Sequence, residues 1–290
     1  MRSLLRSFVF LIISRTALAG GYPICRTVDA QAADPDGRQS RNHYLPGPGN
    51  KYLNDYDLAL AVLDDARRLR SSIVRHLKPM HSGGKLLDWG CGTGRIGLAA
   101  REKYPDTDLY GVEFSPEMAE QAIHNGYKRE NVISGNVEGD LKADHWRKHF
   151  QNNSFDNITM NMVAYMIPDQ ELQQLFHHAH ALLKDEGRFV MTILGEGEDV
   201  ATVLSRFRTQ WGAAPEIDPA MLERLMSANT DLVGKARRHQ IGVIAEMAER
   251  AGLTFHEELV ENHYGTFSKL LVFEKKPHKT KKETFADLSK

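Results

Sequence analysis

Glycines at every second position follow a short apolar stretch that ends in an acidic residue. The apolar stretch at 86–88 ends in Asp88. It is followed by Gly90, Gly92 and Gly94, and an amphipathic pattern begins at Arg95. This order predicts a strand, a tight turn and a helix. Glycine permits positive φ and a close approach of the backbone to a ligand, and a helix N-terminus offers free N–H groups. The turn is therefore a candidate binding site for a polar ligand such as a cofactor.

The spacing of these glycines separates two classes of cofactor. A dinucleotide-binding fingerprint has glycine at its first, third and sixth positions. Gly90 and Gly92 fill the first two, but Arg95 stands at the sixth. The mismatch disfavours a nicotinamide-dependent oxidoreductase, which stays an alternative.

The turn resembles the D-x-G-x-G-x-G signature of the class I S-adenosylmethionine-dependent methyltransferases. The similarity extends over roughly residues 51 to 275, through the order of strands, an acid at the end of the second strand and a C-terminal hairpin. It implies an α/β fold with a doubly wound, mostly parallel seven-stranded sheet and an antiparallel C-terminal hairpin strand. It also implies S-adenosyl-L-methionine as the cofactor and S-adenosyl-L-homocysteine as the product.

Several residues match positions of that family that contact the cofactor. Asp88 corresponds to the acid that orients the turn and the amino-acid part of the cofactor. Glu113 corresponds to the acid that accepts both ribose hydroxyls, and two carboxylate oxygens suit a vicinal diol. The positions expected along the turn and beside the adenine are Gly90, Cys91, Gly92, Thr93, Gly94 and Phe114.

The ends of the third and fourth predicted strands supply the remaining cofactor candidates. Asn136 stands where the family often has an acid that contacts the adenine amino group, and its amide oxygen can accept the same hydrogen bond. Val137 is the alternative for this contact, through its backbone N–H. Asn161 and Met162 close the fourth strand, which in the family faces both cofactor and substrate.

The resemblance implies direct, SN2-type transfer of a methyl group, and we expect a small-molecule acceptor. Alignment of the reactants can supply about 7 to 11 kcal/mol, and a general base is needed only if the nucleophile carries a proton. Tyr165 and His239 are the candidate bases, on loops expected at the carboxyl ends of the strands. A packed or solvated side chain is the competing interpretation of each. A protein or RNA substrate, and a non-catalytic protein that binds S-adenosylmethionine, are the alternative functions.

Hydrophobic periodicity predicts the elements that must position these residues. A long helix is expected from Leu58 to Leu77, and strands and helices alternate after it. Strands are expected over 85–89, 108–113, 131–134, 155–160 and 187–194, and helices over 94–103, after Ser115, over 170–184 and over 241–251. This alternation predicts a parallel sheet with helices on both faces.

Two departures from the alternation follow the fifth strand. Amphipathic patterns near 200–211 and 221–233 predict a helical cap inserted at 195–238, and runs at 253–260 and 269–275 predict a β-hairpin. The cap is locally basic, which favours a carboxylate or phosphate substrate unless these residues form a solvated face. The basic residues are Arg206, Arg208, Arg224, Lys235, Arg237 and Arg238.

Composition and charge limit the class of protein. The 290 residues, 41% of them hydrophobic, are enough for one main domain, placed at 51–275. A net charge of −1 disfavours nucleic acid as a partner, and the oligomeric state stays open. His177, His178 and His180 spread around a predicted helix, so no metal site is expected.

The two ends of the chain differ in composition from the rest. Residues 1–28 contain arginines, no acid and an apolar patch too short to span a bilayer, so they predict a secretory or organellar targeting segment without stable membrane insertion. A cytoplasmic protein is the alternative. Residues 29–50 read as a linker, and 276–290 as a disordered tail.

Overall fold

The computed structural model describes residues 52–135, 146–195 and 197–277. The expected targeting segment, the linker, most of the expected tail, and the candidates Asn136 and Val137 lie outside these residues. The expectations about them therefore stay predictions.

Within the described residues, eight strands form one mixed sheet in the order β3-β2-β1-β4-β5-β8-β6, and β7 also pairs with β8. The first five strands are parallel, and β8 runs antiparallel to its neighbours. The strands are β1 (Lys85–Trp89), β2 (Asp108–Glu113), β3 (Val132–Ser134), β4 (Phe155–Met160), β5 (Leu183–Leu194), β6 (Leu253–Phe255), β7 (Glu261–His263) and β8 (Ser268–Lys275). The predicted fold class is confirmed.

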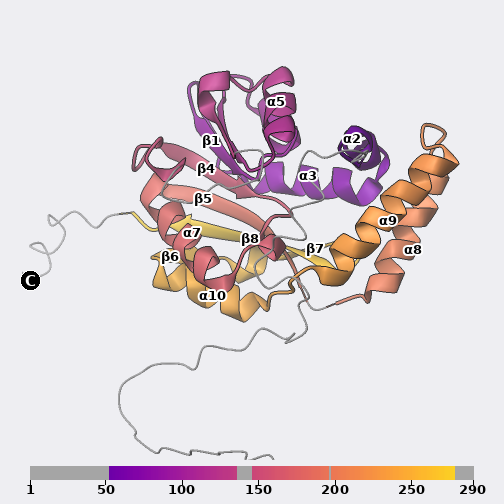
Figure 1. Cartoon of the computed structure of the whole chain (residues 1–290). Coiled ribbons are helices and arrows are strands. Elements are labelled where there is room, and N and C mark those ends of the chain that lie inside the picture. The colour runs from indigo at the N-terminus through magenta and orange to yellow at the C-terminus, as the bar shows by residue number, and fades with distance from the viewer. Residues whose placement is uncertain (1–51, 136–145, 196, 278–290) are drawn as a thin grey trace, which may run out of the picture.

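Helices cover both faces of this sheet (Figure 1). Adjacent residues of a strand point to opposite faces, so Leu86 packs with one group of helices and Leu87 with the other. The first group is α3 (Asp64–His76), α4 (Arg95–Lys103) and α5 (Pro116–His124), and the second is α7 (Asp169–Leu182) and α10 (Ile241–Arg250). Each face of the central strands is therefore buried, as expected for a parallel sheet.

The prediction of a single long helix from Leu58 to Leu77 is wrong in one respect, because the helix is interrupted at Leu63. Two helices result, α2 (Tyr52–Val62) and α3. Leu63 has an extended backbone, and the N–H of Asp64 donates to the side chain of Gln210 instead of a helical carbonyl. Leu63 itself stays buried, so the apolar spacing continues through the break and hides it from a periodicity argument.

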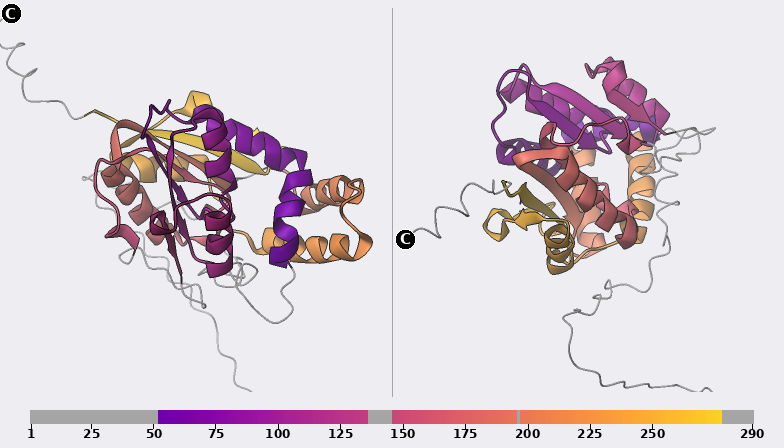
Figure 2. Two further views of the ribbon diagram at one scale, coloured as in Figure 1. Left: turned by 90° about the horizontal axis from the view of Figure 1, so that it is seen from above. Right: turned by 90° about the vertical axis from the view of Figure 1, so that its left-hand side faces the viewer.

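The helical cap is present as α8 (Val200–Gly212) and α9 (Pro219–Lys235). Asp199 and Asp218 accept hydrogen bonds from the first turns of these helices, and Pro219 occupies the first turn of α9. Figures 1 and 2 show α2 beside the two cap helices, at one end of the sheet. The indole N–H of Trp211 in α8 donates to the carbonyl of Ala59 in α2 across 3.0 Å, which ties the cap to α2.

The predicted hairpin forms with a divided first arm. β6 and β7 pair with opposite ends of β8, and a single 3-10 turn at Glu257–Leu259 separates them. Glu257 and Glu258 are exposed in this turn. The two acids therefore lie in solvent, outside the sheet. Because the first arm is divided into β6 and β7, the sheet has eight strands in place of the seven predicted.

Candidate functional site

The glycine turn joins β1 to α4 as predicted. Gly90, Gly92 and Gly94 have φ of 70°, 53° and 86°, values that glycine adopts without strain. The backbone N–H of Gly90 donates to the carbonyl of Val112 across 2.7 Å. A Cβ at Gly90 would lie 2.3 Å from a methyl carbon of Val163. The first glycine is therefore required both for its backbone angle and for the space beside it.

Glu113 holds the turn against the end of β2. Its carboxylate accepts hydrogen bonds from the backbone N–H of Gly92 at 2.8 Å and of Ser115 at 2.9 Å. Burial raises the pKa of Glu113 to about 7, although both hydrogen bonds act in the opposite direction. The neighbouring Ser115 caps α5 by accepting from the N–H of Met118.

Asp88 lies behind the turn rather than at its surface. One of its carboxylate oxygens accepts from the hydroxyl of Thr159 at 2.7 Å and the other from the hydroxyl of Tyr127 at 3.5 Å. Burial raises the pKa of Asp88 to about 7. Asp88 therefore braces β1 against β4 from within the fold.

The other side chains of the turn also point away from its open side. The sulfur of Cys91 packs against Gly111, and burial raises the pKa of this thiol. Gly94 lies against the ring of Tyr127. Thr93 donates to Asp57 in α2 at 2.6 Å. The open side of the turn consequently presents Gly90 and Gly92 with no side chain.

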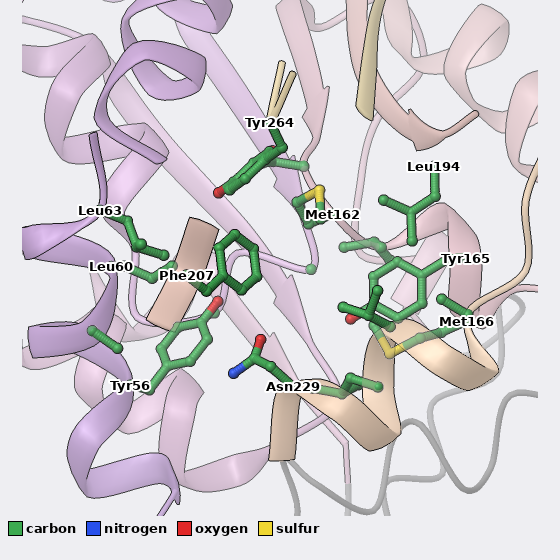
Figure 3. Close-up of a pocket in the computed structure, with 18 of the residues that line it drawn as sticks. Tyr56, Leu60, Leu63, Met162, Tyr165, Met166, Leu194, Phe207, Asn229 and Tyr264 are labelled. Atoms are coloured by element: carbon green, nitrogen blue, oxygen red, sulfur yellow. The ribbon is translucent and has the colours of Figure 1, made fainter. Parts of the chain in front are cut away.

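One cavity begins at this open side and continues below the cap (Figure 3). Together with its opening to solvent it has a volume of about 980 Å³. The first part of its lining is defined as the residues at the turn and at the ends of β2 and β4, with Met118 of α5: Gly90, Gly92, Glu113, Phe114, Met118 and Asn161. The second part is bounded by Tyr56, Ala59, Leu60, Leu63, Met162, Val163, Tyr165, Met166, Leu194, Phe207, Trp211, Asn229, Leu232, Val233, Ala236, Tyr264 and Phe267.

Of the two candidate bases, Tyr165 lines the cavity and His239 does not. The imidazole of His239 is buried, with Nε2 3.2 Å from the carbonyl oxygen of Ala164. Burial lowers the pKa of His239, and its backbone N–H donates to the carbonyl of Leu194. His239 therefore links the 3-10 helix at Ala164–Met166 to the end of β5.

Asn161 and Met162 are fixed by one hydroxyl of β5. Thr192 accepts from the backbone N–H of Met162 at 2.7 Å and donates to the amide oxygen of Asn161 at 3.2 Å. Met162 has a φ of 54°, which is uncommon for a residue with a side chain. Both residues line the cavity where its two parts meet.

The basic residues of the cap do not line the cavity. Their charges are matched by acids or by carbonyl oxygens. Arg206 pairs with Glu198, Arg208 with Glu223, Arg224 with Asp55, and Lys235 with Asp231, while Arg237 donates to the carbonyl of Ile167 and Arg238 to that of Gly195. Among the described lining residues Glu113 is the one carboxylate, and none is Lys, Arg or His.

Sequence reasoning did not identify Asn229 and Asp57. Asn229 occupies the same face of α9 as Leu225 and Leu232, at spacings of four and three residues. A polar residue on the apolar stripe of a helix is a signal that the sequence contains. Asp57 has no such signal, because its partners Thr93 and Arg95 are remote in the chain.

Residues 86–187 match the sequence profile of a methyltransferase domain family. The matched stretch is 102 of the 290 residues. It includes the glycine turn, Glu113 and the loop after β4, so the predicted resemblance to the class I S-adenosylmethionine-dependent methyltransferases is confirmed for the domain.

Two curated proteins are similar to a part of the chain. The malonyl-[acyl-carrier protein] O-methyltransferase of Legionella pneumophila is 23% identical over 174 residues, covering 60% of this chain and 56% of that protein. That of Geobacter sulfurreducens is 26% identical over 165 residues, covering 56% and 55%. The chain thus matches little more than half the length of these relatives.

A solved structure gives a further comparison. Magnesium protoporphyrin IX methyltransferase from Synechocystis, solved with bound S-adenosylhomocysteine, superposes with a TM-score of 0.49 at 15% identity, over 84% of this chain and 95% of that one.

Among the residues placed in the present structure, no cluster of three potential metal ligands occurs. Nor does any helix of the described part have the length and apolarity to cross a bilayer.

Proposed function

We propose that the chain is an S-adenosylmethionine-dependent methyltransferase that acts on a small molecule. The observation that carries this proposal is the continuity of the cavity. It begins at the glycine turn and Glu113 of the methyltransferase domain and ends among apolar side chains of α2, α8 and α9. One space thus has room for a cofactor beside the turn and for an acceptor below the cap.

The first part of the cavity fits the cofactor by its shape and its donors. Gly90 and Gly92 line the cavity without a side chain, and a Cβ at Gly90 would clash with Val163. Glu113 is held by two backbone N–H groups, yet each carboxylate oxygen can accept a second hydrogen bond. The two hydroxyls of a ribose therefore suit this carboxylate, and Phe114 and Met118 offer apolar contacts beside it.

The residues of the second part, and of its junction with the first, have three tasks in the reaction. When bound, S-adenosylmethionine supplies an electrophilic methyl group whose bond to sulfur breaks, with both electrons left on sulfur, as the bond to the acceptor forms. Asn161 and Met162, fixed by Thr192, orient the groups that meet at the junction. The apolar walls exclude water, and Tyr165 offers a hydroxyl near an acceptor that must lose a proton.

The enclosure by α2 and the cap favours a small acceptor over a protein or RNA surface. The names of the two curated relatives describe an acyl group carried by a protein. An acceptor delivered on a carrier is therefore a second candidate for this chain.

The test is transfer of a labelled methyl group by the full chain in a fractionated cell extract. We expect the label in small molecules, and a Gly90→Ala variant should abolish it. Label in protein that hydroxylamine releases as a small hydroxamate supports the carrier-bound acceptor. Label that stays in protein or RNA contradicts a small acceptor, and cofactor binding with no labelled product in any fraction supports a non-catalytic protein.

A further inference from the structure

The second part of the cavity, where the acceptor is proposed to bind and which is called the acceptor part below, contains one amide group, that of Asn229 in α9. Its nitrogen donates to the carbonyl of Leu225, one turn earlier, across 2.8 Å. One of the two amide hydrogens is used within the helix, so the oxygen Oδ1 and the second N–H are left for a ligand. Figure 3 shows the amide between Tyr56 and Tyr165, directed into the space below the cap. The cavity therefore offers a neutral hydrogen-bond acceptor at this point.

The charges around the amide disfavour an ionic ligand. No cationic side chain lines this part among the described residues, and the nearest basic residue of α9 toward its N-terminus, Arg224, pairs with Asp55 at 2.8 Å. Lys235, further along the helix, pairs with Asp231. A carboxylate or phosphate placed here would lose its water without gaining a counter-charge, which is costly. An ammonium ion would also lose its water without gaining a counter-charge, because the one lining carboxylate among the described residues, Glu113, belongs to the first part of the cavity, beside the turn.

The remaining walls are largely apolar and aromatic, with the hydroxyls of Tyr56, Tyr165 and Tyr264 as their other polar groups. Phe207 and Trp211 of α8 have ring centroids 5.2 Å apart, and Tyr264 lies 5.7 Å from Phe207. Aliphatic side chains such as Leu60 and Met166 also belong to this lining. Rings of this kind bind flat or chain-like apolar bodies through burial of area.

We infer that the acceptor is an uncharged, largely apolar molecule with a hydroxyl or N–H group, and that Asn229 selects it by accepting the hydrogen of that group. This inference rests on the proposed function and names the substrate class of the same site. Asn229 is a specificity residue in this account. It contacts the acceptor and leaves the cofactor part of the cavity untouched.

Three matched probes test the inference by calorimetry on the full chain, with and without S-adenosylhomocysteine. 2-Naphthol is neutral and donates a hydrogen bond, 2-methoxynaphthalene lacks the donor, and 2-naphthoate carries a charge. We expect 2-naphthol to bind at least about tenfold more tightly than either of the others, because a buried acceptor left unpaired or a buried charge left unmatched lowers affinity.

Variants assign the preference to the amide. Asn229→Leu removes the oxygen and should bring 2-naphthol and 2-methoxynaphthalene to within about threefold of each other, with an unchanged Kd for S-adenosylhomocysteine. Ser227→Ala, at an exposed position of the same helix, is the matched control and should preserve the wild-type ranking. Asn229→Ala replaces the leucine variant if thermal unfolding shows that the latter does not fold.

Three results would overturn the inference. They are failure of 2-naphthol to bind, binding of 2-naphthoate as tight as that of 2-naphthol, and an unchanged ranking in Asn229→Leu. The measurement without S-adenosylhomocysteine separates this inference from the proposed function. If that compound does not bind, the proposed function fails, while the ranking of the three probes still decides on Asn229.

Discussion

The carboxylate of Asp57 in α2 accepts a hydrogen bond from the hydroxyl of Thr93 in the glycine turn, with 2.6 Å between the oxygens. The same carboxylate accepts from Nε of Arg95 at 2.9 Å. Two residues earlier in α2, Asp55 pairs with Arg224 of the cap. α2 therefore connects the turn of the methyltransferase domain to the helices above the acceptor part of the cavity.

We expect Asp57→Ala to raise the Kd for S-adenosylhomocysteine by about tenfold, because α2 then loses its charge-assisted hydrogen bonds to the turn. The expected loss is moderate, since about a third of both the Asp57 and Arg95 side chains is exposed, at 30% and 32%. Asp64→Ala, an exposed acid at the start of α3, is the control. Equal affinities of the two variants in calorimetry would contradict the coupling through α2.

Gly90→Ala tests the space beside the turn. The new Cβ would meet Val163 at 2.3 Å and would add strain at a φ of 70°. Gly83→Ala is a matched control, because Gly83 has a φ of 75° with no atom within 4 Å of the new Cβ. Both should lose about 1 to 2 kcal/mol of the free energy of unfolding from strain. Gly90→Ala should lose about 1 to 3 kcal/mol more from overpacking and should not bind S-adenosylhomocysteine. Equal denaturation midpoints would rule out the crowding.

Asp88→Asn tests the buried carboxyl behind the turn. Its pKa of about 7 in the folded protein exceeds its ordinary value of 3.8. The folded state therefore binds more protons than the unfolded state between about pH 4 and pH 7. The stability that Asp88 contributes is present below this range and is lost as the pH rises through about 7.

The asparagine variant should reduce this pH dependence while preserving the contacts. Its amide can accept from Thr159 and donate to Tyr127, the two partners of Asp88. We expect the slope of unfolding free energy against pH to become less negative by up to about 1.4 kcal/mol per pH unit. A slope remains, because Glu113 also has a raised pKa. Urea titrations between pH 5 and pH 8 measure the slope in the wild-type chain and in Asp88→Asn. An unchanged slope would show that Asp88 is ionised throughout.

Tyr165 and His239 should separate in their effects. Tyr165→Phe removes a hydroxyl from the cavity and should weaken binding of 2-naphthol without changing the Kd for S-adenosylhomocysteine. His239→Ala breaks the buried contact with Ala164 and should lower the free energy of unfolding by about 1 to 3 kcal/mol. The folded fraction of that variant should bind both ligands normally. Loss of 2-naphthol binding in folded His239→Ala would show that His239 contributes to acceptor binding and would contradict a purely structural role.

The predictable part of this molecule is the part governed by local pattern. The glycine turn, its strand and its helix follow from the spacing of Gly90, Gly92 and Gly94, and Ser115 caps its helix as its position before Pro116 indicates. The cap helices follow from amphipathic periodicity and from Asp199 and Asp218 at their starts.

The rest depends on contacts between distant segments. The break at Leu63 leaves the apolar spacing intact, and Gln210, whose side chain accepts from the backbone N–H of Asp64, lies in the cap. The basic residues of the cap left an anionic substrate and a solvated charged face as alternatives, and acids such as Asp55 and Glu198 pair with them. Asp88 matches a cofactor position in the motif, yet Thr159 and Tyr127 occupy its oxygens inside the fold. Each of these outcomes requires a partner that the local sequence does not identify.

The central claim is that the turn and Glu113 hold S-adenosylmethionine. Calorimetric titration of the full chain with S-adenosylhomocysteine tests it most directly, with the Glu113→Gln variant measured beside it. We predict saturable binding with one ligand per chain, and a loss of at least about tenfold in affinity for the variant, since an amide supplies a single acceptor where the carboxylate serves Gly92 and Ser115. Absence of binding by the wild-type chain, or equal affinity in the two proteins, would contradict the account.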